Sequence, residues 1–174
     1  MESRCVRFNN WLSGHCPMSS AEQVAKLARS GGLSIGLAES CTGGLIAASI
    51  SEVPGCSVYF RGGVVAYDNQ VKQDLLGVPE LLLLQFGAVS EEVARAMAEG
   101  ARRVLRCDLA LSVTGIAGPE GGTAEKPVGT VFVALADDIG CQVRRFRFEG
   151  GRNEVRRATL QAALEWLEMR LKYA

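Results

Sequence analysis

Ser40 lies two residues after an apolar run, Leu33–Ala38, and shortly before two glycines, Gly43–Gly44. The run predicts a buried strand and Leu45–Ile50 predicts a helix, so the segment between them forms a strand-to-helix turn. Such a turn exposes the Ser40 hydroxyl at the carboxyl end of a sheet and directs free backbone N–H groups to the same space. A nucleophile and an oxyanion stabiliser could come from this turn, or Ser40 and Thr42 could only cap the helix.

A serine hydroxyl is a weak nucleophile that needs a base. The one histidine, His15, lies in a segment without helical or strand periodicity, so we do not expect a Ser-His-Asp triad. A lysine could replace the histidine, provided that burial lowers its pKa, and Lys72 is the best candidate base. It follows the strand end at Tyr67 by one short turn, where Asn69 could also converge. A solvated helix lysine is the alternative reading of Lys72, and Lys126 is the alternative base.

Two further groups could line the same site. Tyr67 could hydrogen-bond the lysine or the serine, or could leave its hydroxyl in water. Cys41, beside Ser40, could be the nucleophile itself, but no histidine is available to form a thiolate pair, and a packed thiol is the alternative.

A glycine-rich loop and an arginine could bind an anionic substrate. The loop Thr114–Pro119, beginning with Thr114 and Gly115, could wrap a phosphate or ribose through backbone N–H groups, although it is neither a Walker A loop nor a Gly-x-Gly-x-x-Gly fingerprint. Arg152 begins the last predicted helix and suits an anionic group, or is a surface arginine.

The elements around these residues alternate between helix and strand. Helices are predicted over 19–31, 45–52, 69–76, 90–105 and 152–171, and strands over 33–38, 57–67, 109–113, 129–136 and 141–148. Gly62–Gly63 inside the second strand predicts a bulge or a close backbone approach, and the last two strands are expected to form a hairpin. This order predicts an α/β fold, a three-layer α/β/α sandwich with a mixed, mainly parallel sheet. We expect an irregular extension over 1–18 and one domain over 19–174.

The composition excludes several classes of protein. Lys plus Arg and Asp plus Glu are 19 each, so the zero net charge argues against nucleic acid as a partner. No apolar run approaches the ~20 residues that span a membrane, and no signal core is seen, so a cytoplasmic protein is expected. The six cysteines form no Cys-x-x-Cys pair, so no metal site is expected.

Several motifs in a fixed order carry a resemblance to a known family over roughly residues 20–170. The chain resembles the C-terminal domain of the competence/damage-inducible CinA proteins, also found alone as bacterial nicotinamide-nucleotide amidase. The motifs are Ala38–Gly44, Tyr67–Asn69 with Lys72, Gly87–Ser90, Ser112–Pro119 with Gly121–Gly122, Lys126–Val131, and Gly151–Arg152 with Val155–Arg157.

The resemblance implies an activity and roles for individual residues. The activity is hydrolysis of nicotinamide mononucleotide to nicotinate mononucleotide and ammonia, with no cofactor and no metal. Ser40 matches the nucleophile, Lys72 the general base and Tyr67 a supporting residue. Thr114 and Arg152 match substrate-contacting positions, with Arg152 on the phosphate.

The resemblance also implies roles for the glycines of both loops, and it leaves two alternative functions open. Backbone groups of Thr42, Gly43 and Gly44 would stabilise the oxyanion, and Gly115 would line the substrate site. The resemblance implies a homo-oligomer. The alternatives are a non-catalytic nucleotide-binding or regulatory module linked to competence or DNA damage, and an amidase for a different substrate.

Overall fold

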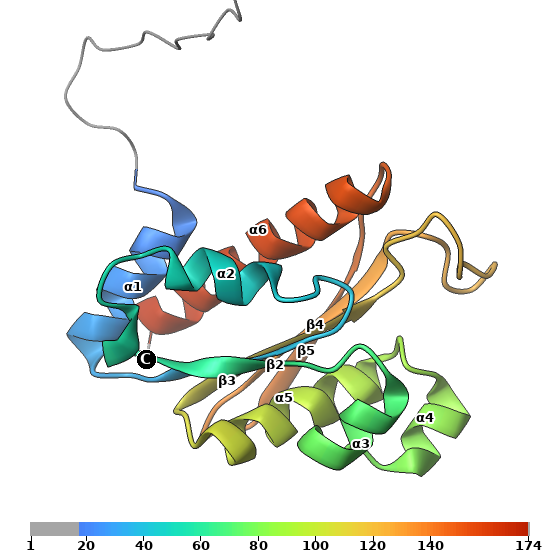
Figure 1. Cartoon of the computed structure of the whole chain (residues 1–174), viewed down its shortest axis with the longest axis horizontal. Helices are drawn as coiled ribbons and strands as arrows, with labels where there is room; N and C mark the ends of the chain where they lie inside the picture. Colours follow the sequence, from blue (N-terminus) through green and yellow to red (C-terminus); the bar gives the residue numbers. More distant parts are fainter. Residues whose placement is uncertain (1–17, 174) are drawn as a thin grey trace, which may run out of the picture.

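The computed structural model describes residues 18–173 of the chain (Figure 1). The expected irregular extension over 1–18 therefore lies, except for Met18, outside the described residues. The elements in chain order are α1 (Ser20–Gly31), β1 (Ile35–Glu39), α2 (Leu45–Ser51), the 3-10 turn η1 (Cys56–Val58), β2 (Phe60–Val65), α3 (Asn69–Leu76), α4 (Glu80–Phe86), α5 (Glu91–Leu105), β3 (Leu109–Gly115), β4 (Thr130–Ala136), β5 (Cys141–Arg147) and α6 (Arg152–Lys172).

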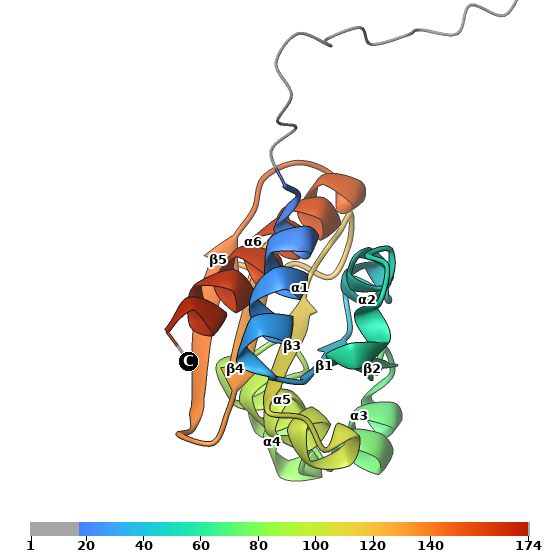
Figure 2. The same cartoon turned by 90° about the vertical axis from the view of Figure 1, so that its left-hand side faces the viewer.

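The strands form one five-stranded sheet in the order β2-β1-β3-β4-β5. Strand β1 pairs in parallel with β2 and β3, while β4 is antiparallel to both β3 and β5. Helices α1, α2 and α6 cover one face, and α3, α4 and α5 cover the other (Figure 1), and Figure 2 shows α1 beside α6. The predicted three-layer α/β/α fold with a mixed sheet is confirmed, with β4 alone running against the other strands.

The central strands are buried on both faces. Every residue of β1 is buried, and Leu37 packs in the core under α1 and α6 while its neighbour Ala38 packs in the core under α5. Continuous apolar runs of this kind are typical of strands covered by helices on both sides. Burial on both faces fixes the register of β1, and with it the position at which the chain leaves the sheet at Ser40.

Helix caps hold the elements where the sequence predicts them. Ser19 and Glu22 form a capping box at the start of α1, with Oγ of Ser19 accepting from Glu22 N at 3.3 Å. Asp68 caps α3 by accepting from Gln70 N at 2.7 Å. The bond fixes the start of α3, one turn before Lys72.

The predicted strand 57–67 is shorter than expected. The structure divides it into η1 and β2, and Tyr59 between them is buried in the core. The predicted bulge is present, because Ile35 pairs with Phe60 and Gly36 with Gly62, which leaves Arg61 without a partner on β1.

No helix within residues 18–173 is long and apolar enough to cross a bilayer. Over the same range, no three His, Cys, Asp or Glu side chains are grouped in a way that could hold a metal ion.

Candidate active site

The three parallel strands β1, β2 and β3 end at the same edge of the sheet, drawn at the right in Figure 1. Ser40 follows β1 directly, Tyr67 lies two residues after the end of β2, and Thr114 and Gly115 end β3. These chain ends surround a cavity of about 270 Å³. Its lining is Ser40, Cys41, Tyr67, Asn69, Lys72, Ala88, Val89, Thr114–Gly118, Glu120, Gly121 and Arg152. Six of the nine predicted site residues thus share one cavity.

Ser40 is held by its backbone at the end of β1. Its N–H donates to the carbonyl of Val113 at 3.0 Å, and its carbonyl accepts from Gly43 N at 3.0 Å. The residue is only 9% exposed, so its hydroxyl lies in a largely dry environment at the cavity wall. A buried hydroxyl at the end of a central strand has the placement that acyl-transfer nucleophiles need.

Lys72 supplies an amine to the same cavity. The residue is 1% exposed, and Nζ donates to the backbone carbonyl of Tyr67 at 3.0 Å. Burial lowers the pKa of Lys72, and the nearby Asp68 and Cys41 counter this effect in part. The lowered pKa increases the fraction of neutral amine near neutral pH, which is the form that accepts a proton.

Tyr67 and Arg152 form the rim of the cavity. Arg152 donates through Nη2 to the hydroxyl oxygen of Tyr67 at 2.6 Å and through Nη1 to the carbonyl of Gly118 at 3.0 Å. The Tyr67 hydroxyl therefore bonds Arg152 instead of the expected Lys72 or Ser40, and Tyr67 contacts Lys72 through its backbone carbonyl. Arg152 joins the end of β2 to the glycine-rich loop and to α6.

Thr114 and Gly115 form the opposite wall. Thr114 is buried and its hydroxyl donates to the carbonyl of Ala88 at 2.7 Å, so it ties β3 to the segment before α5. A Cβ atom at Gly115 would lie 2.9 Å from the carbonyl oxygen of Thr130 and 3.1 Å from Sγ of Cys41. Only glycine fits at this wall without displacing Cys41 beside Ser40.

Thr42, Gly43 and Gly44 do not line the cavity. Thr42 is fully buried, and its hydroxyl has no hydrogen-bond partner in the described part of the chain. Gly43 N donates to Ser40 O and Gly44 N donates to Oε2 of Glu39, both at 3.0 Å. The prediction that these two glycines offer free N–H groups to an oxyanion is wrong, because protein acceptors already occupy both.

Two residues at this turn were not predicted as site residues. Glu39 is 1% exposed and accepts three backbone N–H groups from the start of α2. Arg156, on the first turns of α6, donates to the carbonyl of Thr42 through Nε at 3.2 Å and Nη2 at 2.7 Å. A charged residue after an otherwise apolar run was the sequence signal for Glu39. Arg156 was present only as part of the motif Val155–Arg157, and its contact with Thr42, 114 residues away, could not be seen in the sequence.

The alternative nucleophile and the alternative base are both poorly suited. Burial raises the pKa of the Cys41 thiol to about 12, with Glu39 adding to the rise and backbone N–H groups and Arg152 opposing it. Cys41 is therefore a protonated thiol at neutral pH. Lys126 donates to the carbonyl of Phe86 at 2.7 Å and lines a separate hollow beside Phe132.

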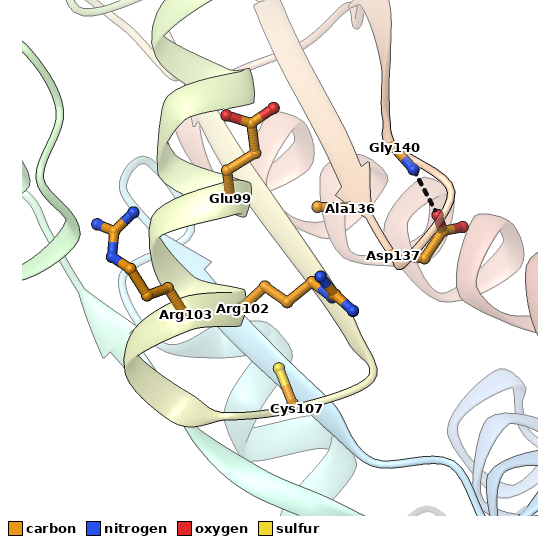
Figure 3. Close-up of a pocket in the computed structure, with 7 residues that line it drawn as sticks. All are labelled: Glu99, Arg102, Arg103, Cys107, Ala136, Asp137 and Gly140. Carbon is orange, nitrogen blue, oxygen red and sulfur yellow. Dashed lines mark hydrogen bonds between the residues drawn. The ribbon is translucent and has the colours of Figure 1, made fainter.

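A larger hollow of about 520 Å³ lies at the opposite end of the sheet (Figure 3). Its two arginines already bond to protein, because Arg102 donates to the carbonyl of Asp108 at 3.1 Å and Arg103 to that of Leu76 at 2.9 Å. Burial raises the pKa of its thiol, Cys107, to about 11. The lining of this hollow contains neither a serine nor a lysine, whereas the smaller cavity contains both, so the smaller cavity is the candidate active site.

Comparison with known proteins agrees with the fold. The sequence matches the family described as the CinA C-terminal domain over residues 18–171. It is 59% identical over 148 residues to a CinA-like protein of Geobacter sulfurreducens, an alignment that covers 85% of this chain and 36% of that protein. A CinA-like protein of Geobacter metallireducens is 52% identical over 175 residues, which cover 98% of this chain and 42% of that one. The chain thus spans well under half the length of these curated relatives.

Solved structures give the same result. The competence/damage inducible protein CihA from Agrobacterium tumefaciens superposes with a TM-score of 0.83 at 42% identity, covering 92% of this chain and 99% of that one. A CinA superfamily protein from Klebsiella pneumoniae gives a TM-score of 0.85 at 30% identity, covering 90% of this chain and all of that one. The chain described here therefore belongs to the family of CinA C-terminal domains.

Proposed function

We propose that this chain is a metal-independent amidase that hydrolyses nicotinamide mononucleotide to nicotinate mononucleotide and ammonia. The observation that carries the proposal is that Ser40 and a buried lysine of lowered pKa, Lys72, line one cavity. The resemblance to the amidase family supports the choice of substrate. The protonated state of Cys41 supports Ser40, rather than the thiol, as the nucleophile.

The reaction proceeds through an acyl-enzyme. Oγ of Ser40 attacks the carboxamide carbon while Nζ of Lys72 takes the hydroxyl proton, and the electron pair of the C=O bond moves to oxygen. The tetrahedral intermediate collapses, the C–N bond breaks, and Lys72 returns its proton to the leaving ammonia. Water then attacks the Ser40 ester with Lys72 as base, which releases the carboxylate and restores the serine.

Arg152 is the candidate contact for the phosphate of the substrate. It is exposed at the rim of the cavity, beside the glycine-rich loop. An arginine binds a phosphate monoester through charge-assisted hydrogen bonds, and such contacts favour a nucleotide over the free base.

Ammonia release from nicotinamide mononucleotide by the purified protein, with a chelator present, tests the proposal. Ser40→Ala should abolish release, and Lys72→Met should lower kcat by about 10²–10⁴-fold, the usual contribution of a positioned general base. Lys126→Met is the matched control, because this lysine also donates to a backbone carbonyl but lies outside the cavity.

Three results would contradict the proposal. Turnover that survives Ser40→Ala would exclude Ser40 as the nucleophile. A folded wild-type protein that binds nicotinamide mononucleotide without releasing ammonia would indicate a binding module. Release from other amides, but not from this nucleotide, would leave the serine chemistry and change the substrate.

A further inference from the structure

The turn that carries Ser40 is built around a buried carboxylate. Oε2 of Glu39 accepts from Gly44 N at 3.0 Å and from Ile46 N at 3.2 Å, and Oε1 accepts from Ala47 N at 2.7 Å. Within the described part of the chain, no Lys, Arg or His forms an ion pair with Glu39. A carboxylate at 1% exposure is costly unless its oxygens are hydrogen-bonded, so these amides and the carboxylate hold each other in place.

A second contact holds the same turn from the other side. The guanidinium of Arg156 donates twice to the carbonyl of Thr42, at 2.7 and 3.2 Å. Glu39 and Arg156 together, which we call the turn clamp, hold the backbone from Thr42 to Ala47, directly after Cys41. The clamp does not use the side chain of Ser40, which stays at the cavity wall.

The backbone N–H groups of the turn differ in whether they remain available to a ligand. Gly43 N and Gly44 N donate to protein oxygens, whereas Cys41 N and Thr42 N donate to no oxygen acceptor within residues 18–173. Both of these N–H groups lower the pKa of the Cys41 thiol against the larger effect of burial. They therefore favour negative charge at an atom that lines the cavity beside Ser40.

We propose that Glu39 is a positioning residue for the reaction of Ser40. By accepting the N–H groups at the start of α2, Glu39 sets the turn so that the backbone N–H of Cys41, which lines the cavity, binds the oxyanion. That oxyanion forms when Oγ of Ser40 bonds to the amide carbon and the C=O electron pair moves to oxygen. The inference rests on the proposed amidase function, and Glu39 itself touches neither substrate nor reacting atoms.

The first test is the kinetics of Glu39→Gln. The amide keeps the size of the side chain but replaces one acceptor oxygen by a donor, which faces a backbone N–H and shifts the turn. A misplacement of about 1 Å can lower a rate ~10²-fold, so kcat should fall by about 10–100-fold while KM stays within about threefold. Glu22→Gln is the matched control, because Glu22 accepts from Ser19 N at 2.7 Å in the cap of α1, away from the cavity. It should leave kcat unchanged.

A second variant addresses the case in which Glu39→Gln fails to fold. Arg156→Lys loses the twofold contact with the Thr42 carbonyl while it keeps the charge, and it should lower kcat in the same direction. If both variants fold, their effects should be less than additive, because both act through one turn. Circular dichroism and thermal unfolding identify the folded variants.

A substrate-independent readout separates this inference from the choice of substrate. A fluorophosphonate probe reacts with an activated serine, and the rate at which it labels Ser40 reports the same turn. Slower labelling of folded Glu39→Gln or Arg156→Lys, but not of Glu22→Gln, supports the inference even if nicotinamide mononucleotide is not hydrolysed. Wild-type rates in a folded Glu39→Gln or Arg156→Lys variant would overturn it. If the wild-type protein shows neither labelling nor turnover, both proposals are overturned.

Discussion

Replacing Lys72 by methionine should remove activity and also change how stability depends on pH. In the wild-type protein, burial lowers the pKa of Lys72 below its ordinary value of 10.5. At pH values between the folded-state pKa of Lys72 and 10.5, this lysine binds more protons in the unfolded chain than in the folded protein. The free energy of unfolding therefore rises with pH across this window, by up to about 1.4 kcal/mol per pH unit for one group.

The methionine variant lacks this contribution. Its side chain also loses the bond to the Tyr67 carbonyl, which costs roughly 1–3 kcal/mol, but this loss does not depend on pH. Other titrating groups are common to both proteins and cancel in the difference. The stability of the wild type relative to Lys72→Met should thus be flat at low pH, rise through the window and level off above 10.5.

Urea unfolding followed by circular dichroism from pH 6 to 10.5 measures this difference. The pH profile of wild-type kcat/KM gives a second, independent value, because the neutral amine is the base and activity should rise through the same folded-state pKa. The two measurements should agree. A stability difference that stays constant over this range would refute the argument that a buried, destabilised lysine serves as the base.

Three further variants test the walls of the site. Gly115→Ala should destabilise the protein by about 1–3 kcal/mol and lower kcat, because the new Cβ meets the Thr130 carbonyl and the Cys41 thiol; urea unfolding and ammonia release measure both effects. Thr114→Val should cost roughly 1–3 kcal/mol in the same unfolding experiment, because it leaves the Ala88 carbonyl without its donor. Arg152→Gln should raise KM for nicotinamide mononucleotide by about tenfold or more, and change KM for the nucleoside without the phosphate less, since a hydrogen bond to a charged group contributes about 1.5–3 kcal/mol. Equal changes for the two substrates would contradict the phosphate contact.

The fold and much of the cavity could be predicted from the sequence, because both depend on local sequence signals. Buried runs such as Leu109–Val113 and the caps at Ser19 and Ser90 are local signals, and alternating helices and strands bring the carboxyl ends of parallel strands together. Lys72 could be singled out because it lies one short turn beyond such a strand end. The extent of β2 was overestimated, because Cys56–Val58 forms a 3-10 turn and the strand ends at Val65.

The hydrogen bonds inside the site could not be predicted from spacing. Whether Gly44 N is free depends on the side-chain conformation of Glu39, five residues earlier, which turns inward and occupies it. The Tyr67 hydroxyl bonds Arg152, which is 85 residues away in the chain. This long-range contact depends on how the start of α6 lies against the end of β2, and no local sequence pattern encodes that placement.

The most direct measurement is to trap the acyl-enzyme. The protein is mixed with nicotinamide mononucleotide, quenched in acid within milliseconds to seconds, digested and analysed by mass spectrometry. We expect an ester of nicotinate mononucleotide on Ser40, which is absent from Ser40→Ala and disappears as the substrate is consumed. Steady ammonia release with the adduct on Cys41, or turnover by Ser40→Ala, would contradict the serine–lysine mechanism.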